Sequence, residues 1–127
     1  MSKEILSTAA APAAIGPYSQ AVKAGGFLFS SGQIAIDPAT QKLVEGDVAV
    51  QAERVMENLK GILTAAGLTF DDVVKTTCFL KNMGDFGVFN EVYGRYFPKD
   101  APARSCVEAA RLPKDVLVEV EVTALCR

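Results

Sequence analysis

The sequence PARSCVEAARLPKDVLVEVEVTAL, residues 102–125, contains two alternating runs joined by a loop with a proline. In the second run, residues 116–124, every even position is apolar, whereas Glu119 and Glu121 occupy the odd face. A period of two is typical of a β-strand with one buried face. The first run, which contains Arg104, alternates as well. We therefore expect two strands here, one of which carries two carboxylates on a single face.

The simplest arrangement pairs these two runs as an antiparallel hairpin. In the register centred on the loop at residues 112–113, Arg104 lies opposite Glu121. Cys106 then lies opposite Glu119, so a cation, a thiol and two acids are expected on one sheet surface. The alternative interpretation is an ordinary solvated face, on which a cross-strand ion pair contributes little.

Two helices are expected further along the chain. Apolar residues follow the 3.6-residue period over residues 47–66, with Asp47 as the cap at the start. Gly61 weakens this helix relative to alanine, and a packing contact would account for it. The second helix covers residues 85–97, with Asp85 as its cap. Strands are expected at residues 19–23, 27–31, 33–36, 40–45 and 73–80, the last of which is apolar on both faces and so lies centrally.

This order of elements predicts an α+β fold, in which two helices pack on one face of a single mixed sheet and residues 1–127 form one domain. The opposite face of the sheet stays uncovered, and it carries apolar residues, among them Leu117, Leu125 and Cys106. An uncovered face of this kind favours association with other copies. We expect a symmetric homo-oligomer in which the Arg/Glu face becomes a partly desolvated cleft between protomers.

The composition restricts both the chemistry and the partners. Thirteen basic and fifteen acidic residues give a net charge of −2 without a basic cluster, so nucleic acid is not an expected partner. The chain has no histidine, which leaves proton transfer to Glu, Asp, Tyr, Cys, a backbone group or a positioned water. Its three cysteines are widely spaced, which indicates reduced thiols in a cytosolic protein rather than a zinc site. No secretory signal and no membrane span of ~20 apolar residues is expected.

Several motifs together carry a resemblance to a known family. They are IGPYSQAV at 15–22, SSGQI at 30–34, VVKTTCFL at 73–80, FNEVY at 89–93, PARSCVEAARLPKD at 102–115 and VEVEV at 118–122. Each is a weak signal alone, but the combination is specific. Over essentially its whole length the chain resembles the Rid (reactive intermediate deaminase, YjgF-like) family, and in detail the RidA subgroup. The resemblance implies a chorismate-mutase-like fold assembled as a homotrimer, with ligand clefts between neighbouring subunits.

The resemblance also implies an activity. RidA-type members act as 2-iminobutanoate/2-iminopropanoate deaminases, which hydrolyse reactive imines and enamines to 2-keto acids and ammonia without a cofactor. Pyridoxal-phosphate enzymes such as threonine dehydratase release these intermediates. The alternative is a non-enzymatic trimer that binds keto or amino acids or acts as a chaperone. Ribonuclease activity, with which the broader family has been linked, fits poorly with the charge and the missing histidine.

Carried over position by position, the resemblance assigns roles to individual residues. Arg104 would hold the substrate carboxylate, for which a guanidinium is well shaped. Cys106 would contribute its backbone carbonyl and its thiol near the attacking water, which Glu119 would order or activate. Burial raises the pKa of such a glutamate and a nearby arginine lowers it, and both outcomes stay open. Cys106 as a covalent nucleophile is the sharper alternative, although no histidine is present to form its thiolate. The rest of the pocket wall would consist of Tyr18, Ser31, Gly32 and Asn90.

Overall fold

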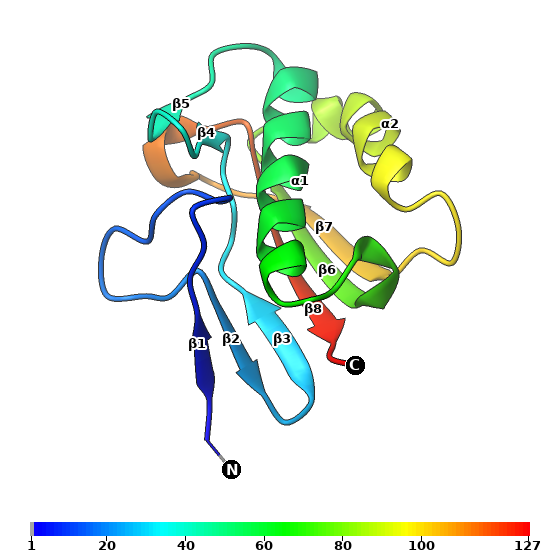
Figure 1. Ribbon diagram of the computed structural model, residues 1–127. Coiled ribbons are helices and arrows are strands. Elements are labelled where there is room, and N and C mark those ends of the chain that lie inside the picture. The colour runs from blue at the N-terminus through cyan, green and yellow to red at the C-terminus, as the bar shows by residue number, and fades with distance from the viewer. Residues whose placement is uncertain (1) are drawn as a thin grey trace.

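The computed structural model describes residues 2–127, in which two helices pack on one face of a mixed six-stranded sheet (Figure 1). The strand order is β1-β2-β3-β8-β6-β7, and only β6 and β7 are parallel neighbours. A separate two-stranded hairpin consists of β4 and β5. The predicted α+β class, with two helices on one face of a mixed sheet, is thereby confirmed, whereas the expectation of a single sheet is wrong because β4 and β5 form a second one. The strands are β1 Glu4–Leu6, β2 Ala21–Ala24, β3 Phe27–Ser30, β4 Ile36–Asp37, β5 Lys42–Leu43, β6 Val73–Leu80, β7 Ala103–Glu108 and β8 Val118–Leu125.

Helix α1, Val48–Ala65, agrees with its prediction. The Asp47 carboxylate accepts a hydrogen bond from the Val50 backbone N–H at 3.0 Å and so caps the helix. The helix packs on β8 and against α2. A Cβ atom at Gly61 would lie 2.9 Å from the carbonyl carbon of Ala10. This confirms that a packing contact, made by the N-terminal arm, requires the glycine.

Helix α2, Phe86–Tyr96, also lies where the periodicity places it, but its predicted cap is wrong. Asp85 makes no capping hydrogen bond. Instead, a short 3₁₀ turn, Met83–Asp85, precedes the helix, and the Asn82 side chain accepts from the Gly84 N–H at 2.8 Å. The turn continues directly into the helix, so the first turn of α2 starts from a backbone that is already ordered.

The predicted hairpin between residues 104–109 and 116–124 is wrong, because β6 lies between β7 and β8. Cys106 of β7 is beside Cys78 of β6, which in turn is beside Val120 of β8. The segments β6, α2 and β7 form a strand–helix–strand crossover, which produces parallel pairing. The chain then passes the end of β6 and adds β8 on its other side, antiparallel.

The N-terminal part of the sheet differs from its prediction in three places. Strand β1 was not predicted, yet it pairs antiparallel with β2 as an edge strand. The predicted strand at residues 33–36 is reduced to one isolated bridge between Gln33 and Val120, followed by the two residues of β4. The segment at 40–45 likewise contains only β5. Short pieces of this kind are held by tertiary contacts rather than by their own alternation.

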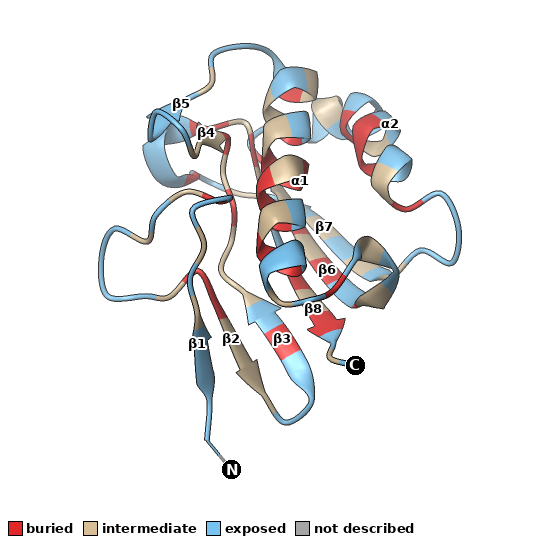
Figure 2. Ribbon diagram, in the orientation of Figure 1, coloured by how far each residue is buried: buried red, intermediate tan, exposed pale blue. Residues whose placement is uncertain are grey.

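The two faces of the sheet differ in burial, as Figure 2 shows along β6 and β8. The even positions of β8 lie buried under the helices. On the uncovered face Phe27, Phe29 and Leu125 remain 36%, 46% and 50% exposed. Cys106 lies on the helix-covered face, so its predicted place on the open face is wrong, whereas that of Leu125 is correct. No helix within residues 2–127 is long and apolar enough to cross a membrane.

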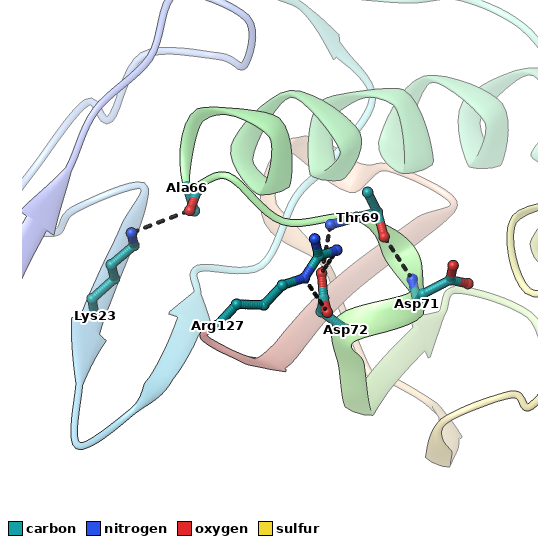
Figure 3. A network of polar contacts seen from close by, with 6 residues as sticks. All are labelled: Lys23, Ala66, Thr69, Asp71, Asp72 and Arg127. Atoms are coloured by element: carbon teal, nitrogen blue, oxygen red, sulfur yellow. Dashed lines mark hydrogen bonds and ion pairs between the residues drawn. The ribbon is translucent and has the colours of Figure 1, made fainter.

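Polar contacts hold the segment that follows α1, including the 3₁₀ turn Phe70–Asp72 (Figure 3). Arg127 donates to both carboxylate oxygens of Asp72, at 3.0 and 2.8 Å. The Arg127 hydrogen bond, together with one from the Thr69 N–H, lowers the pKa of Asp72. Lys23 Nζ donates to the Ala66 carbonyl at 3.2 Å, where a cation complements the helix dipole. One contact thus joins β2 to the end of α1, and another joins the chain terminus to the 3₁₀ turn that follows.

Candidate active site

The predicted site residues fall into two groups on opposite faces of the sheet. Arg104 is beside Thr76, which is beside the buried Val122, so Arg104 belongs to the helix-covered face. Glu119 is beside Phe79 and belongs to the uncovered face. The expectation that Arg104 and Glu119 share one face of a single chain is therefore wrong. Cys106 and Asn90 lie with Arg104, and the residues near Glu119 are Tyr18, Ser31 and Gly32.

Helix α2 holds the Arg104 side chain in place. Arg104 Nη1 donates to Asn90 Oδ1 at 2.7 Å. The guanidinium carbon lies 4.8 Å from the centroid of the Tyr93 ring and 5.3 Å from that of Phe86. Positions 86, 90 and 93 are four and three residues apart, so they form one stripe of the helix. The sequence indicated Asn90 through its motif and assigned the two rings only to the apolar stripe of the helix, with Asn90 outside that stripe, whereas all three contact Arg104.

The Arg104 guanidinium has no carboxylate partner among residues 2–127. The ion pairs within this range are those of Arg111 with Asp115 and of Arg127 with Asp72. Arginine offers five N–H donors, and the bond to Asn90 is the hydrogen bond the structure gives to this guanidinium. A half-buried cation without a counter-ion carries an uncompensated desolvation cost, which an anionic ligand would remove. The geometry thus suits a bound carboxylate.

Cys106 lies next to this arginine on β7 and is half-buried. Burial raises the pKa of its thiol, and Arg104 offsets that effect only in part. Cys78, beside it on β6, is fully buried, and burial raises its pKa to about 12. Both thiols are thus protonated at neutral pH. The arrangement gives no support to Cys106 as a thiolate nucleophile.

Glu119 is a second half-buried charge among the predicted site residues. Its half-buried carboxylate makes no hydrogen bond or ion pair within the described chain, and it lies against Gly32. A Cβ atom at Gly32 would lie 2.8 Å from Glu119 Cδ, so only glycine leaves room for this side chain. Burial, and secondly the charge of Glu121, raise the pKa of Glu119. The sequence left open whether burial would raise the pKa of Glu119 or a nearby arginine would lower it. Within one chain burial raises it, because Arg104 lies on the other face of the sheet.

Glu119 lines a cavity of about 610 Å³. Tyr18, Ser31 and Gly32 line the same cavity, whereas Asn90 and Arg104 do not. The Ser31 hydroxyl donates to the Ser19 carbonyl at 2.5 Å, which fixes the turn that leads to Gly32. The remaining walls are mostly apolar and include Pro12, Ala13, Ile15, Ile34, Ile36 and Pro113.

Gln20 fastens the N-terminal arm that forms one wall of the cavity. The side chain is 4% exposed, and its amide nitrogen donates to the carbonyls of Thr8, Ala11 and Pro12 at 3.0, 3.2 and 2.7 Å. Its amide oxygen accepts from the Thr8 N–H at 2.6 Å. The motif IGPYSQ contained this residue, but nothing in its local pattern indicated that it would bind the arm.

Asn58 holds another lining segment of the cavity, which contains Ile34 and Ile36. It is fully buried in α1 and donates to the carbonyls of Ile34 and Ile36 at 3.2 and 2.9 Å. Arg54 Nε in turn donates to its amide oxygen at 3.1 Å. A polar residue on the buried side of a helix is the signal that could have identified it. The cavity walls are therefore held by hydrogen bonds from two buried side chains, those of Gln20 and Asn58.

Potential metal ligands do not converge in the described part of the chain. Among residues 2–127 there is no group of three or more His, Cys, Asp or Glu side chains that could hold a metal ion. The residues of the two half-sites themselves suit carboxylate recognition by a guanidinium and proton transfer by a carboxyl with a raised pKa.

Comparison with known proteins gives a consistent picture. A family model described as endoribonuclease L-PSP matches residues 8–126. The chain is 56% identical over 122 residues to a RutC family protein of Pyrococcus horikoshii, which covers 96% of this chain and 97% of that protein. The crystal structure of E. coli TdcF with bound serine is 45% identical with a TM-score of 0.92, covering 98% and 99% of the two chains. RidA from an Antarctic Psychrobacter gives the same identity and TM-score over 96% and 98%.

Proposed function

The chain belongs to the endoribonuclease L-PSP family, also called the YjgF/Rid family, and we propose that it is a 2-iminobutanoate/2-iminopropanoate deaminase. The observation that carries this proposal is the pair of half-buried, unpaired charges, Arg104 and Glu119. A carboxylate-bearing substrate and one proton transfer would use one each. The serine bound to a relative, TdcF, belongs to the same class of small carboxylates and supports this choice.

The chemistry needs little more than these two groups. A 2-imino acid has its carboxylate next to an electrophilic C=N bond, and Arg104 can bind that carboxylate through two parallel hydrogen bonds. Water adds to the imine carbon, the C–N bond of the resulting carbinolamine breaks, and a 2-keto acid and ammonia are released. Glu119, whose pKa is raised by burial, is suited to accept the proton of the water and return it to the nitrogen.

The site requires two copies of the chain. Because Arg104 and Glu119 lie on opposite faces of the sheet, one chain does not bring them together. The group of Arg104, Asn90 and Cys106 from one protomer would meet the group of Glu119, Tyr18, Ser31 and Gly32 from the next. A homotrimer with a cleft at each subunit boundary satisfies this, since heterologous contacts close into rings. The exposed Phe27, Phe29 and Leu125 on the uncovered face support association.

Mixing two inactive variants tests both the reaction and the shared site. We expect Arg104→Ala and Glu119→Gln to be inactive alone, when 2-iminobutanoate is generated by threonine dehydratase and the surviving imine is trapped with semicarbazide. After the two are unfolded together and refolded at a 1:1 ratio, about a quarter of the boundaries combine an intact Arg104 with an intact Glu119. About a quarter of wild-type activity should therefore return.

Two other results would count against the proposal. No recovery in the mixed sample would contradict a site shared between chains. Undiminished trapping with the wild-type protein would contradict the deaminase itself. Arg111→Ala is the matched control, because Arg111 is an exposed arginine paired with Asp115, and it should keep full activity.

A binding module is the second candidate, favoured by the bound serine of the relative. Saturable binding of 2-ketobutyrate without turnover would support it, as would a chaperone-like action of the exposed apolar face. RNA cleavage is disfavoured by the net charge of −2, although the description of the family includes it. Cleavage that survived purification and was lost in Glu119→Gln would revive that activity.

The cysteines bear on where the protein works. Cys78, Cys106 and Cys126 are all free thiols in the structure. Such thiols stay reduced in the cytosol, where pyridoxal-phosphate enzymes also release reactive imines. A cytoplasmic location therefore accompanies the proposed function.

A further inference from the structure

We propose that Tyr93 is a positioning residue for Arg104, and that its bond to Thr76 sets the direction in which the guanidinium faces its ligand. The inference rests on the proposed function, because it concerns how the same site holds a carboxylate. Tyr93 is 7% exposed, and its ring centroid is 4.8 Å from the guanidinium carbon. A cation over an aromatic face at this distance is attracted by the ring quadrupole, and the attraction is larger where water is excluded.

The hydroxyl of Tyr93 fixes the ring to the strand next to Arg104. The Tyr93 and Thr76 hydroxyl oxygens are 2.7 Å apart, and Thr76 is fully buried. Thr76 on β6 is the direct register partner of Arg104 on β7. The ring that contacts the guanidinium is therefore hydrogen-bonded to the residue beside that same arginine, which links α2 to β6 at this point. Phenylalanine would keep the ring but lose this tie.

The neighbours of Tyr93 decide which donors of Arg104 stay free. Asn90 accepts from Nη1, and Phe86 places a second ring 5.3 Å from the guanidinium carbon. Within residues 2–127, Nε and Nη2 make no hydrogen bond. A carboxylate binds a guanidinium through two adjacent N–H groups in one plane. The stripe of Phe86, Asn90 and Tyr93 thus holds the guanidinium while leaving an edge for the substrate.

The titratable groups near this cluster provide no negative charge that could hold the guanidinium in place of Tyr93. Cys78 and Cys106 lie close to Arg104 and Tyr93, but burial raises the pKa of both thiols and keeps them neutral. The nearest fixed partners of the cation are therefore an amide and two aromatic rings. Removing the Tyr93 ring should leave the positive charge in place but change the orientation of the guanidinium. This should weaken binding of the carboxylate more than it affects proton transfer at Glu119.

The test separates KM from kcat in the imine-trapping assay, with affinity for 2-ketobutyrate as a second readout that needs no turnover. We expect Tyr93→Leu to raise KM and the dissociation constant about 5- to 30-fold, with a smaller change in kcat. Tyr93→Phe and Thr76→Val keep the ring and should raise both about 2- to 5-fold. Tyr93→Phe should therefore retain most of the affinity that Tyr93→Leu loses.

Tyr96→Phe is the matched control. Tyr96 lies on the same helix and its hydroxyl donates to Glu57 at 2.8 Å, so this change removes the same group away from Arg104. It should leave KM and affinity unchanged. Equal effects of Tyr93→Phe and Tyr96→Phe, or wild-type affinity in Tyr93→Leu, would overturn the inference. If Tyr93→Leu fails to fold, the comparison of the two phenylalanine variants decides. If the wild-type protein hydrolysed no imine, the proposed function would be contradicted instead. The affinity of the variants for 2-ketobutyrate would still test the role of Tyr93.

Discussion

Replacing Gly32 by alanine should impair catalysis while leaving the fold almost unchanged. The new Cβ would overlap Glu119 Oε2 and would lie 2.8 Å from Glu119 Cδ and 3.1 Å from Cγ. Carbon atoms pack at about 3.5–4.0 Å, so the carboxyl group has to move by about 0.7–1.2 Å. A displacement near 1 Å from a reacting geometry costs roughly 100-fold in rate. We therefore expect kcat to fall about 100-fold.

The same change should affect stability only slightly. The group that moves is the end of a flexible side chain rather than backbone. Alanine also reduces the conformational freedom of the unfolded chain, which stabilises by about 0.4–1 kcal/mol where the backbone tolerates it. The two effects oppose each other, and the free energy of unfolding should change by less than about 1 kcal/mol. Activity and stability are thus expected to separate.

The assay is kcat from imine trapping, combined with urea unfolding of the same samples. Gly94→Ala is the control, because a Cβ there meets nothing within 4 Å; it should keep full activity and stabilise α2 by up to about 1 kcal/mol. In the Glu119→Gln background, Gly32→Ala should add little, since both changes act on one group. A folded Gly32→Ala protein with a wild-type kcat would refute the role assigned to Glu119.

Three shorter predictions concern charge, packing and thiol reactivity. Glu121→Gln removes a like charge that raises the pKa of Glu119, so the acidic limb of the kcat profile should move to lower pH; an unmoved limb would show that burial alone sets that pKa. Because the folded pKa of Glu119 is raised, the free energy of unfolding falls as pH rises through that pKa, and this fall should shrink in the variant. Gly61→Ala should lower the free energy of unfolding by up to about 2 kcal/mol, because the clash with the Ala10 backbone outweighs the gain in helix propensity; increased stability in urea would contradict the contact. Cys78, fully buried with its pKa raised to about 12, should react with iodoacetamide at pH 8 only after unfolding, and labelling of the native protein there would contradict this.

The helices and the central strand could be predicted because their signals are local. The 3.6-residue period over residues 47–66 and the apolar faces of residues 73–80 each follow from one continuous segment. Strand β1 has no such signal, since three residues are too few to show alternation. Gln20 and Asn58 also escaped prediction, because they bind backbone carbonyls of irregular segments that only the folded chain brings near.

The neighbours of β7 were mispredicted for a different reason. Alternation shows which residues of one strand share a face, but not which strand lies beside it. Two runs separated by a short loop favour a hairpin, whereas the order strand, helix, strand over β6, α2 and β7 favours a parallel crossover. The structure has the parallel crossover. As a result Cys106 stands in line with Val120 across β6, and the parity of the register puts Arg104 and Glu119 on opposite faces.

This separation also resolves the conflict between burial and the arginine over the pKa of Glu119. In one chain burial prevails, because the cation is on the far side of the sheet. In the proposed cleft the Arg104 of a second protomer approaches, and alone it would lower that pKa. A substrate bound as proposed would place its own carboxylate on the guanidinium and neutralise much of that charge. Burial would then again be the larger influence on the pKa of Glu119, as it is in the single chain, and the proposed ion pair with the substrate would favour proton transfer by this carboxyl.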